Sequence, residues 1–306
     1  MALSPQELHA ELRGLLSFPV TTFNRENEID LTRYREHLQY MMSENPDGLF
    51  VCGGTGEFFS LNLEEYFELV ETAVDEVAGQ LPVVAGVGYG TQLAIDFASA
   101  AEEAGADGIM VMPPYLINAE QKGLYQHYAA IAESTNLGMI LYMRDNAIFA
   151  PDTVARLAEI PNIVGFKDGY GNMERLIRIR LAVGDELVML NGMPTAEMSA
   201  EAFFGVGVTT YSSAVFNFVP EISRAFYEAI SDGEDETVDK LMTDFYLPLV
   251  QLRDQVKGYA VSLVKAGLRA RGMASAGPAR SPLVNPTREH IAELKSIINQ
   301  GLALVG

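Results

Sequence analysis

One lysine of the chain stands where an amine could do covalent chemistry. Lys167 ends the apolar run IVGFK at residues 163–167, whereas the other lysines fall in helical or surface patterns. In a strand, side chains alternate, so Phe166 and Lys167 point to opposite faces. Desolvation holds a buried amine in its neutral form, which is the form that attacks a carbonyl. Lys167 is therefore a candidate Schiff-base residue; the structural alternative is an ion pair with Asp168 or Asp145.

A tyrosine ends the preceding apolar run and would lie beside this amine. Tyr142 closes the segment MILY at residues 139–142. Neighbouring strands lie ~4.8 Å apart, so the phenol and the Lys167 amine could share one substrate. The phenol could move protons there, or it could be a core tyrosine with a satisfied hydroxyl. Arg144 follows on the rim, either as a solvated charge or as a group that binds a substrate carboxylate.

A glycine-rich turn offers a second type of binding group. The sequence GGTGE at residues 53–57 follows one apolar run and precedes a helical pattern. The backbone N–H groups of Gly54 and Gly56, with the Thr55 hydroxyl, could hold a carboxylate. The alternative is a tight turn with no ligand. The spacing is not that of a nucleotide-binding P-loop, and GVGYG at residues 86–90 lacks the third glycine of a dinucleotide loop.

Ser212 ends another apolar run, where its hydroxyl could bind substrate or cap the next turn. The four histidines are far apart in sequence and no CxxC occurs, so we expect no His- or Cys-based metal site and no cofactor. Cys52 is the only cysteine, which favours a reducing, cytoplasmic compartment.

Composition excludes several classes of partner. Asp and Glu number 41 against 21 Lys and Arg, a formal net charge of −20 that repels nucleic-acid phosphates. No apolar run approaches the ~18 residues needed to span a membrane, and the first residues lack a signal-peptide pattern. The sequence therefore predicts a cytoplasmic protein that binds a small molecule.

The elements that must position these residues alternate regularly. Eight apolar segments bounded by Gly, Pro or Asp predict strands, several of them apolar throughout, as in parallel sheets buried on both faces. They span residues 15–21, 48–53, 82–88, 108–113, 139–143, 163–168, 187–192 and 208–212. Helical patterns fill the gaps, one of them begun by Asn62 and Glu65 at capping-box spacing.

Eight such units predict an α/β fold, a (β/α)₈ TIM barrel, over residues 1–230 with a short N-terminal helix. Three further helices are expected in a C-terminal extension, residues 231–306, at 234–252, 259–270 and 287–304. A doubly wound sheet is the structural alternative. In a barrel, function sits at the C-terminal ends of the strands, which is where Lys167 and Tyr142 fall.

Taken together, these residues resemble the dihydrodipicolinate synthase/N-acetylneuraminate lyase family of class I, lysine-dependent barrel enzymes. The likeness runs from about Leu15 to Pro220. The matching segments are GGTGE (53–57), ADGIMVMPPY (106–115), KGLYQHYAAIAE (122–133), LY (141–142) and GFKD (165–168). By this resemblance Lys167 is the Schiff-base lysine, Tyr142 its acid/base partner, and Thr55 the contact to the 2-oxo-acid carboxylate and a proton relay.

Other segments are similar to the 5-dehydro-4-deoxyglucarate dehydratase branch. They are YMRDN (142–146), FKDGYGN (166–172), NGMPTAE (191–197), SSAVFNF (212–218) and GPARSPL (277–283). In the synthase a second tyrosine follows the position of Tyr115, whereas this chain has Leu116 there. The chain also lacks the Asn-x-Pro that usually follows the position of Tyr142. This likeness implies a decarboxylating dehydratase that acts on 5-dehydro-4-deoxy-D-glucarate, a sugar acid with two carboxylates.

The resemblance also suggests how that substrate is held. Thr55 with Gly54 and Gly56 would bind the carboxylate beside the ketone. The candidates for the far carboxylate are Arg144, Asn191 and Ser212. The alternatives are an aldolase of the same family that releases pyruvate, a metal-dependent aldolase, and a non-catalytic barrel that binds a small acid. The family likeness further implies a homo-oligomer, a tetramer or a dimer.

Overall fold

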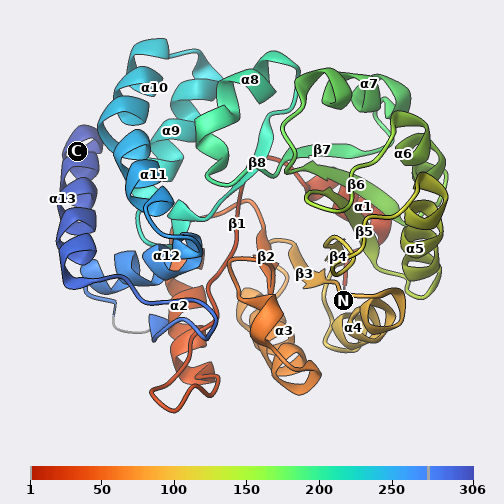
Figure 1. The fold of residues 1–306 in the computed structure, drawn as a ribbon, viewed down its shortest axis with the longest axis horizontal. Coiled ribbons are helices and arrows are strands. Elements are labelled where there is room, and N and C mark those ends of the chain that lie inside the picture. Colours follow the sequence, from red (N-terminus) through yellow and green to blue (C-terminus); the bar gives the residue numbers. More distant parts are fainter. Residues whose placement is uncertain (1, 274–275) are drawn as a thin grey trace.

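Eight short parallel strands form the centre of the structure, a computed structural model that describes residues 2–273 and 276–306. The strands close into one barrel in chain order, and helices surround it (Figure 1). The strands are β1 Leu15–Ser17, β2 Leu49–Val51, β3 Val83–Val87, β4 Gly108–Val111, β5 Gly138–Met143, β6 Ile163–Asp168, β7 Val188–Asn191 and β8 Thr210–Ser213. The predicted (β/α)₈ barrel is confirmed.

A helix follows each strand. These helices are α2 Leu31–Ser43, α3 Leu63–Val77, α4 Thr91–Glu103, α5 Gln121–Glu133, α6 Pro151–Ala158, α7 Met173–Val183, α8 Ala200–Gly205 and α9 Pro220–Asp232. The predicted capping box begins α3: the Asn62 side chain accepts from the Glu65 N–H, and the Glu65 carboxylate accepts from the Asn62 N–H. Local sequence signals therefore set this boundary.

Six of the eight strands are shorter than the sequence predicts, β1 and β2 by the most residues. β1 ends at Ser17 rather than at residue 21, because Pro19 has no N–H to donate to a neighbouring strand. β2 ends at Val51 because the next residue, Cys52, takes a φ of 50°, which turns the chain out of the sheet. The residues that follow these two strands belong to loops, and Phe18, Gly54 and Thr55 of these loops line a cavity.

Side chains of the strands divide between two apolar layers. Phe166 packs among residues between the barrel and its helices, while Tyr142 and Ile140 pack in the barrel interior. The short helix α1, Pro5–Glu11, closes the bottom of the barrel, where Leu8 lies against Gly108 and Gly138 at the starts of β4 and β5. The opposite, C-terminal end of the strands remains accessible from outside.

The C-terminal helices gather on one side of the barrel, with α13 outermost (Figure 1). They are α10 Asp235–Leu241, α11 Leu247–Asp254, α12 Tyr259–Ala270 and α13 Arg288–Val305. The helix predicted at residues 234–252 contains a widened π turn at Met242–Tyr246, directly before Pro248, whose ring and missing N–H disfavour a regular α-helical turn. No helix among the described residues is both long and apolar enough to span a membrane.

Candidate active site

The site is built around Lys167, which β6 directs into the barrel. Its side chain is only 3% exposed, and Nζ lies 4.0 Å from the centre of the Phe18 ring. Burial, aided by the positive charge of Arg144, holds the pKa of the Lys167 ammonium well below its usual range. The amine is therefore available in its neutral, nucleophilic form.

The alternative of a structural ion pair at Lys167 does not match the geometry. Asp145 is paired with Arg144, its carboxylate 3.1 Å from Nε. Asp168 is buried, and its Oδ1 accepts hydrogen bonds from the backbone N–H groups of Tyr170 and Gly171, at 2.7 and 3.0 Å. Both carboxylates named as partners thus have other partners.

Tyr142 lies beside the amine, as the strand register requires. β5 and β6 pair Tyr142 with Lys167, and Nζ is 4.7 Å from the centre of the phenol ring. The hydroxyl donates to the Gly192 carbonyl at 3.0 Å and accepts from Nη1 of Arg144 at 3.4 Å. Burial raises the pKa of Tyr142, although Arg144 opposes this, so the residue starts as a neutral phenol that can donate a proton.

Two glycines make room for this pair. A Cβ at Gly192 would stand 2.6 Å from Cγ of Lys167 and 2.9 Å from Cε2 of Tyr142. A Cβ at Gly169 would stand 2.8 Å from the same Tyr142 carbon. All three distances are too short for real contacts, so the residues that follow β6 and β7 must be glycine for Lys167 and Tyr142 to hold their positions.

We expect Gly192→Ala to lower kcat by roughly 10²-fold, since it displaces both groups by a fraction of an ångström or more. Gly205→Ala is the matched control, because a Cβ at Gly205 would meet nothing within 4 Å. Both variants would be compared by kcat and by melting temperature. A Gly192→Ala enzyme with wild-type kcat would show that the crowding has no catalytic consequence.

The glycine-rich turn after β2 contributes to the wall of the same cavity. Gly54 and Thr55 line it, and Gly54 is exposed. Gly56 does not line it: this residue is buried against the backbone of Cys52, and its carbonyl accepts from Thr21 Oγ1 at 2.6 Å. Gly56 therefore lies outside the cavity lining, because the turn folds back on itself there.

A buried ion pair holds this turn from behind. Glu57 and Lys265 of α12 are both fully buried and paired with each other. Glu57 also accepts from the backbone N–H of Arg280 at 2.8 Å, and Lys265 donates to the Pro278 carbonyl at 2.9 Å. Burial lowers the pKa of Lys265 to about 8 against the attraction of Glu57. The C-terminal segment therefore fixes the loop that carries Thr55.

Lys265→Met should lower the free energy of unfolding by about 3–5 kcal/mol, since it leaves the Glu57 carboxylate buried without its partner. The double variant Glu57→Gln/Lys265→Met should recover a large part of that loss, because no charge is then stranded. Urea unfolding of both variants gives the two values. If the free energy of unfolding fell equally in the single and the double variant, an unpaired buried charge would not be the cause of the destabilisation.

The remaining predicted residues differ in where they lie. Arg144 and Ser212 line the cavity. Asn191 does not: its amide donates to the Ala196 carbonyl at 3.0 Å, and its Oδ1 accepts from the Met193 N–H at 3.0 Å. This corrects the prediction that Asn191 reaches the substrate, because its side chain is turned into the loop that follows β7.

The cavity as a whole has a volume of about 410 Å³ at the C-terminal end of the barrel. Apolar side chains such as Phe18, Met110 and Leu249 make up much of its lining. Besides the Lys167 amine, its ionisable lining residues are Arg144, Arg253 and Asp145. Two guanidinium cations and one carboxylate favour an anionic ligand, despite the strongly negative charge of the chain.

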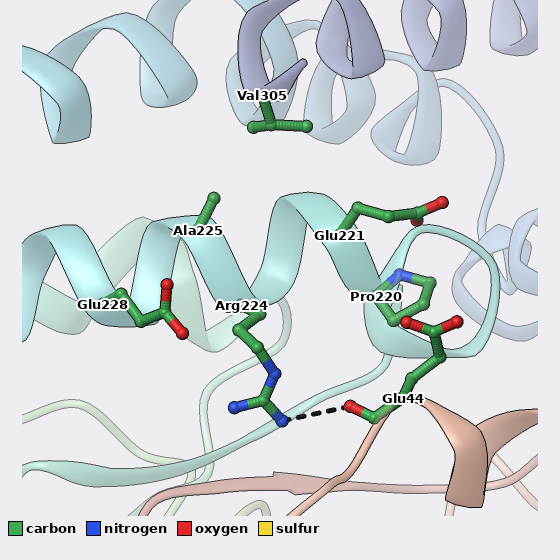
Figure 2. Close-up of a pocket in the computed structure, with 7 residues that line it drawn as sticks. All are labelled: Glu44, Pro220, Glu221, Arg224, Ala225, Glu228 and Val305. Carbon is green, nitrogen blue, oxygen red and sulfur yellow. Dashed lines mark hydrogen bonds between the residues drawn. The ribbon is translucent and has the colours of Figure 1, made fainter.

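A second cavity, of about 260 Å³, lies away from the mouth of the barrel. Figure 2 shows it between α9 and the end of α13, with Arg224 donating to the Glu44 carbonyl at 3.2 Å. None of the predicted site residues lines it. Elsewhere, no three His, Cys, Asp or Glu side chains among the described residues form a group that could hold a metal ion.

Comparison with known proteins identifies the family of this chain. The model of the dihydrodipicolinate synthetase family matches residues 11–301. The chain belongs to this family. Solved structures of dihydrodipicolinate synthase from Oceanobacillus iheyensis and from Bacillus clausii are similar to it, each with a TM-score of 0.88, at 25% and 27% identity. The alignments cover 97% and 95% of this chain and 99% and 98% of those chains.

Curated relatives point to one branch of the dihydrodipicolinate synthetase family. A protein of Streptomyces griseus subsp. griseus is 50% identical over 300 residues, 96% of this chain and 93% of its own length. One of Rhizobium rhizogenes is 48% identical over 303 residues, 98% of this chain and 100% of its own. Both are named "Probable 5-dehydro-4-deoxyglucarate dehydratase". The predicted resemblance to this family and branch is confirmed.

Four residues at the candidate site of this family member were not predicted from the sequence. Gly169 and Gly192 each follow a strand directly, a position that could have marked them as spacers. Thr195 and Arg253 also line the cavity. Thr195 lies in one of the recognised motifs, whereas Arg253 sits in the C-terminal extension, and no local pattern connects it to the barrel mouth.

Proposed function

We propose that this chain converts 5-dehydro-4-deoxy-D-glucarate into 2,5-dioxopentanoate, carbon dioxide and water through an imine on Lys167. The observation that carries the proposal is the buried Lys167 amine, whose pKa burial lowers, beside the Tyr142 phenol in an anion-favouring cavity. The names of the curated relatives supply the substrate. No cofactor enters the reaction.

The first steps use the amine and the phenol together. The Lys167 nitrogen attacks the substrate ketone, and Tyr142 donates its proton to the carbinolamine oxygen, which leaves as water. The products are an iminium and a Tyr142 phenolate, with Arg144 next to it. The iminium acidifies the neighbouring methylene, and the phenolate is then placed to remove one of its protons. One residue thus acts first as acid and then as base.

Elimination and decarboxylation follow from the same electron sink. The β-hydroxyl takes the proton that Tyr142 has just accepted and leaves as water, and the enamine becomes an iminium conjugated with a new carbon–carbon double bond. The bond to the far carboxylate breaks, its electron pair flows into this conjugated system, and carbon dioxide leaves. Protonation of the resulting dienamine and hydrolysis of the imine release 2,5-dioxopentanoate and free Lys167. No external oxidant or reductant is needed.

The turn at Gly54 and Thr55 is the proposed site for the carboxylate beside the ketone. Within the described residues, the Thr55 hydroxyl makes no hydrogen bond to the chain, and neither do the N–H groups of Gly54 and Thr55. Uncommitted donors of this kind suit a carboxylate. Ser212, on strand β8 at the other side of β1, is proposed to donate to a substrate hydroxyl.

Product analysis separates this reaction from its alternatives. The purified protein would be incubated with 5-dehydro-4-deoxy-D-glucarate, and carbon dioxide, 2,5-dioxopentanoate and pyruvate would be measured. Equimolar carbon dioxide and 2,5-dioxopentanoate are expected. Pyruvate would instead identify an aldolase, and no product at all would favour a barrel that only binds the acid. Activity that is lost in EDTA would indicate a metal-dependent aldolase.

We also propose that the chain forms a cytoplasmic homo-oligomer, a dimer or a tetramer. Tyr115, Leu116 and Ile117 form an apolar run that is 65%, 74% and 61% exposed on the loop after β4. Apolar groups this exposed favour a protein contact. The sole cysteine, buried Cys52, suits a reducing compartment. Analytical ultracentrifugation tests the assembly, and a sedimenting monomer would contradict it.

A further inference from the structure

We propose that Arg253 and Thr195 form a subsite that binds the substrate carboxylate distant from the ketone, which makes Arg253 the residue that selects dicarboxylic over monocarboxylic sugar acids. This inference rests on the proposed function. It also assigns a part in substrate recognition to the C-terminal extension, because Arg253 belongs to α11 rather than to the barrel.

Arg253 is held in place and yet keeps donors free. Its side chain is 20% exposed and lines the same cavity as Lys167. Nη1 donates to Thr195 Oγ1 at 2.7 Å, and Nε donates to the Asp254 carboxylate at 2.8 Å. Within the described residues, Nη2 makes no hydrogen bond. Both N–H groups of Nη2 thus remain for an anion.

Thr195 completes a pair of donors. Because its Oγ1 accepts from Arg253, its hydroxyl hydrogen is free to point elsewhere. The residue has a φ of 49°, which is uncommon and strained for a β-branched side chain. Its loop is fixed by the Met198 N–H, which donates to the Thr195 carbonyl at 3.0 Å, and by the Asn191 amide. Strain held in this way is typical of binding sites.

The positions of the two arginines separate their tasks. Arg144 hydrogen-bonds to Tyr142 and lowers the pKa of Lys167, so it lies at the reacting end of the cavity. Arg253 is not among the groups that shift the pKa of Tyr142 or Lys167, and its Nη1 contacts Thr195 in the loop after β7. A substrate whose ketone is joined to Lys167 would direct its other end away from Arg144. Arg253 is the remaining cation there.

The chemistry predicts which kinetic constant depends on Arg253. The far carboxylate loses its charge as carbon dioxide leaves, so a contact to it stabilises the bound substrate more than the transition state. Removing the contact should therefore raise KM and leave kcat similar or higher. A residue that merely supported the fold would change both constants, and with every ligand.

The test compares Arg253→Gln with the wild type on two acids. One is 5-dehydro-4-deoxy-D-glucarate, and the other is a 3-deoxy-2-oxohexonate, whose far end is a primary alcohol. Imine formation is measured for each by borohydride trapping over a range of concentrations. Arg178→Gln is the matched control, since Arg178 is an exposed arginine on α7, paired only with Glu174.

Loss of one charge-assisted contact should weaken imine formation with the dicarboxylic acid about 10- to 100-fold, and with the monocarboxylic acid less than about twofold. Equal losses for both acids, or no loss for either, would overturn the proposal. Failure of the proposed function would look different: the wild type would release no carbon dioxide, while a preference for the dicarboxylic acid that Arg253→Gln removes would still support the subsite.

Discussion

Replacing Lys167 with alanine should abolish both turnover and imine formation while the barrel stays folded. Without the amine no iminium forms, so neither the methylene nor the far carboxylate can react, and kcat/KM should fall by about 10⁴-fold or more. Stability should not suffer greatly, because a buried amine with a lowered pKa is itself costly to the fold. Carbon dioxide release, borohydride trapping and thermal unfolding measure the three effects.

Lys122→Ala provides the control for this experiment. Lys122 is an exposed lysine on α5 that does not line the cavity, and its loss should leave all three measurements unchanged. The free-enzyme pH profile adds a second check: because the pKa of Lys167 is lowered, kcat/KM should already be high well below the usual pKa of a lysine. Turnover by Lys167→Ala itself would refute covalent catalysis at this position.

Tyr142→Phe should give the second largest effect, a fall in kcat of about 10²- to 10⁴-fold. The change removes the hydroxyl but keeps the ring, which lies 4.7 Å from the Lys167 nitrogen. This one hydroxyl is the proposed proton donor for the carbinolamine and, as the phenolate, the proposed base for the methylene. Trapped imine should still accumulate, but slowly. Adding borohydride at successive times would trap the imine and give its rate of formation. Product assays would give kcat.

Tyr128→Phe is the matched control for the tyrosine variant. Tyr128 is equally buried, packs against Phe149 between α5 and the barrel, and its hydroxyl has no partner among the described residues. Its removal should leave kcat unchanged. If Tyr142→Phe retained kcat within a few fold, another group would have to move the protons, and the assignment of Tyr142 would fail.

The barrel and its reactive pair could be predicted because each depends on local periodicity. Short apolar runs with turn residues at both ends recur eight times, and alternation within the run at residues 163–168 separates Phe166 from Lys167. Parallel strands in chain order then place Tyr142 next to Lys167. These inferences need only the geometry of one strand and its neighbour.

The corrected and missed residues depend on contacts between distant segments. Asn191 ends a strand like Lys167, but the turn at Ala196 captures its amide. The Glu57–Lys265 pair joins positions that are more than 200 residues apart, and Arg253 reaches the cavity only because α11 packs over the barrel mouth. Periodicity carries no information on such packing, so a single sequence cannot reveal it.

Mass mapping of the reduced adduct tests the central claim most directly. The protein would be treated with 5-dehydro-4-deoxy-D-glucarate and borohydride, digested, and analysed by mass spectrometry. We predict a single modified site, at Lys167, with trapped species that correspond to the substrate before and after loss of water and carbon dioxide. An adduct on the other buried lysine, Lys265, or no adduct during active turnover, would contradict an imine at Lys167.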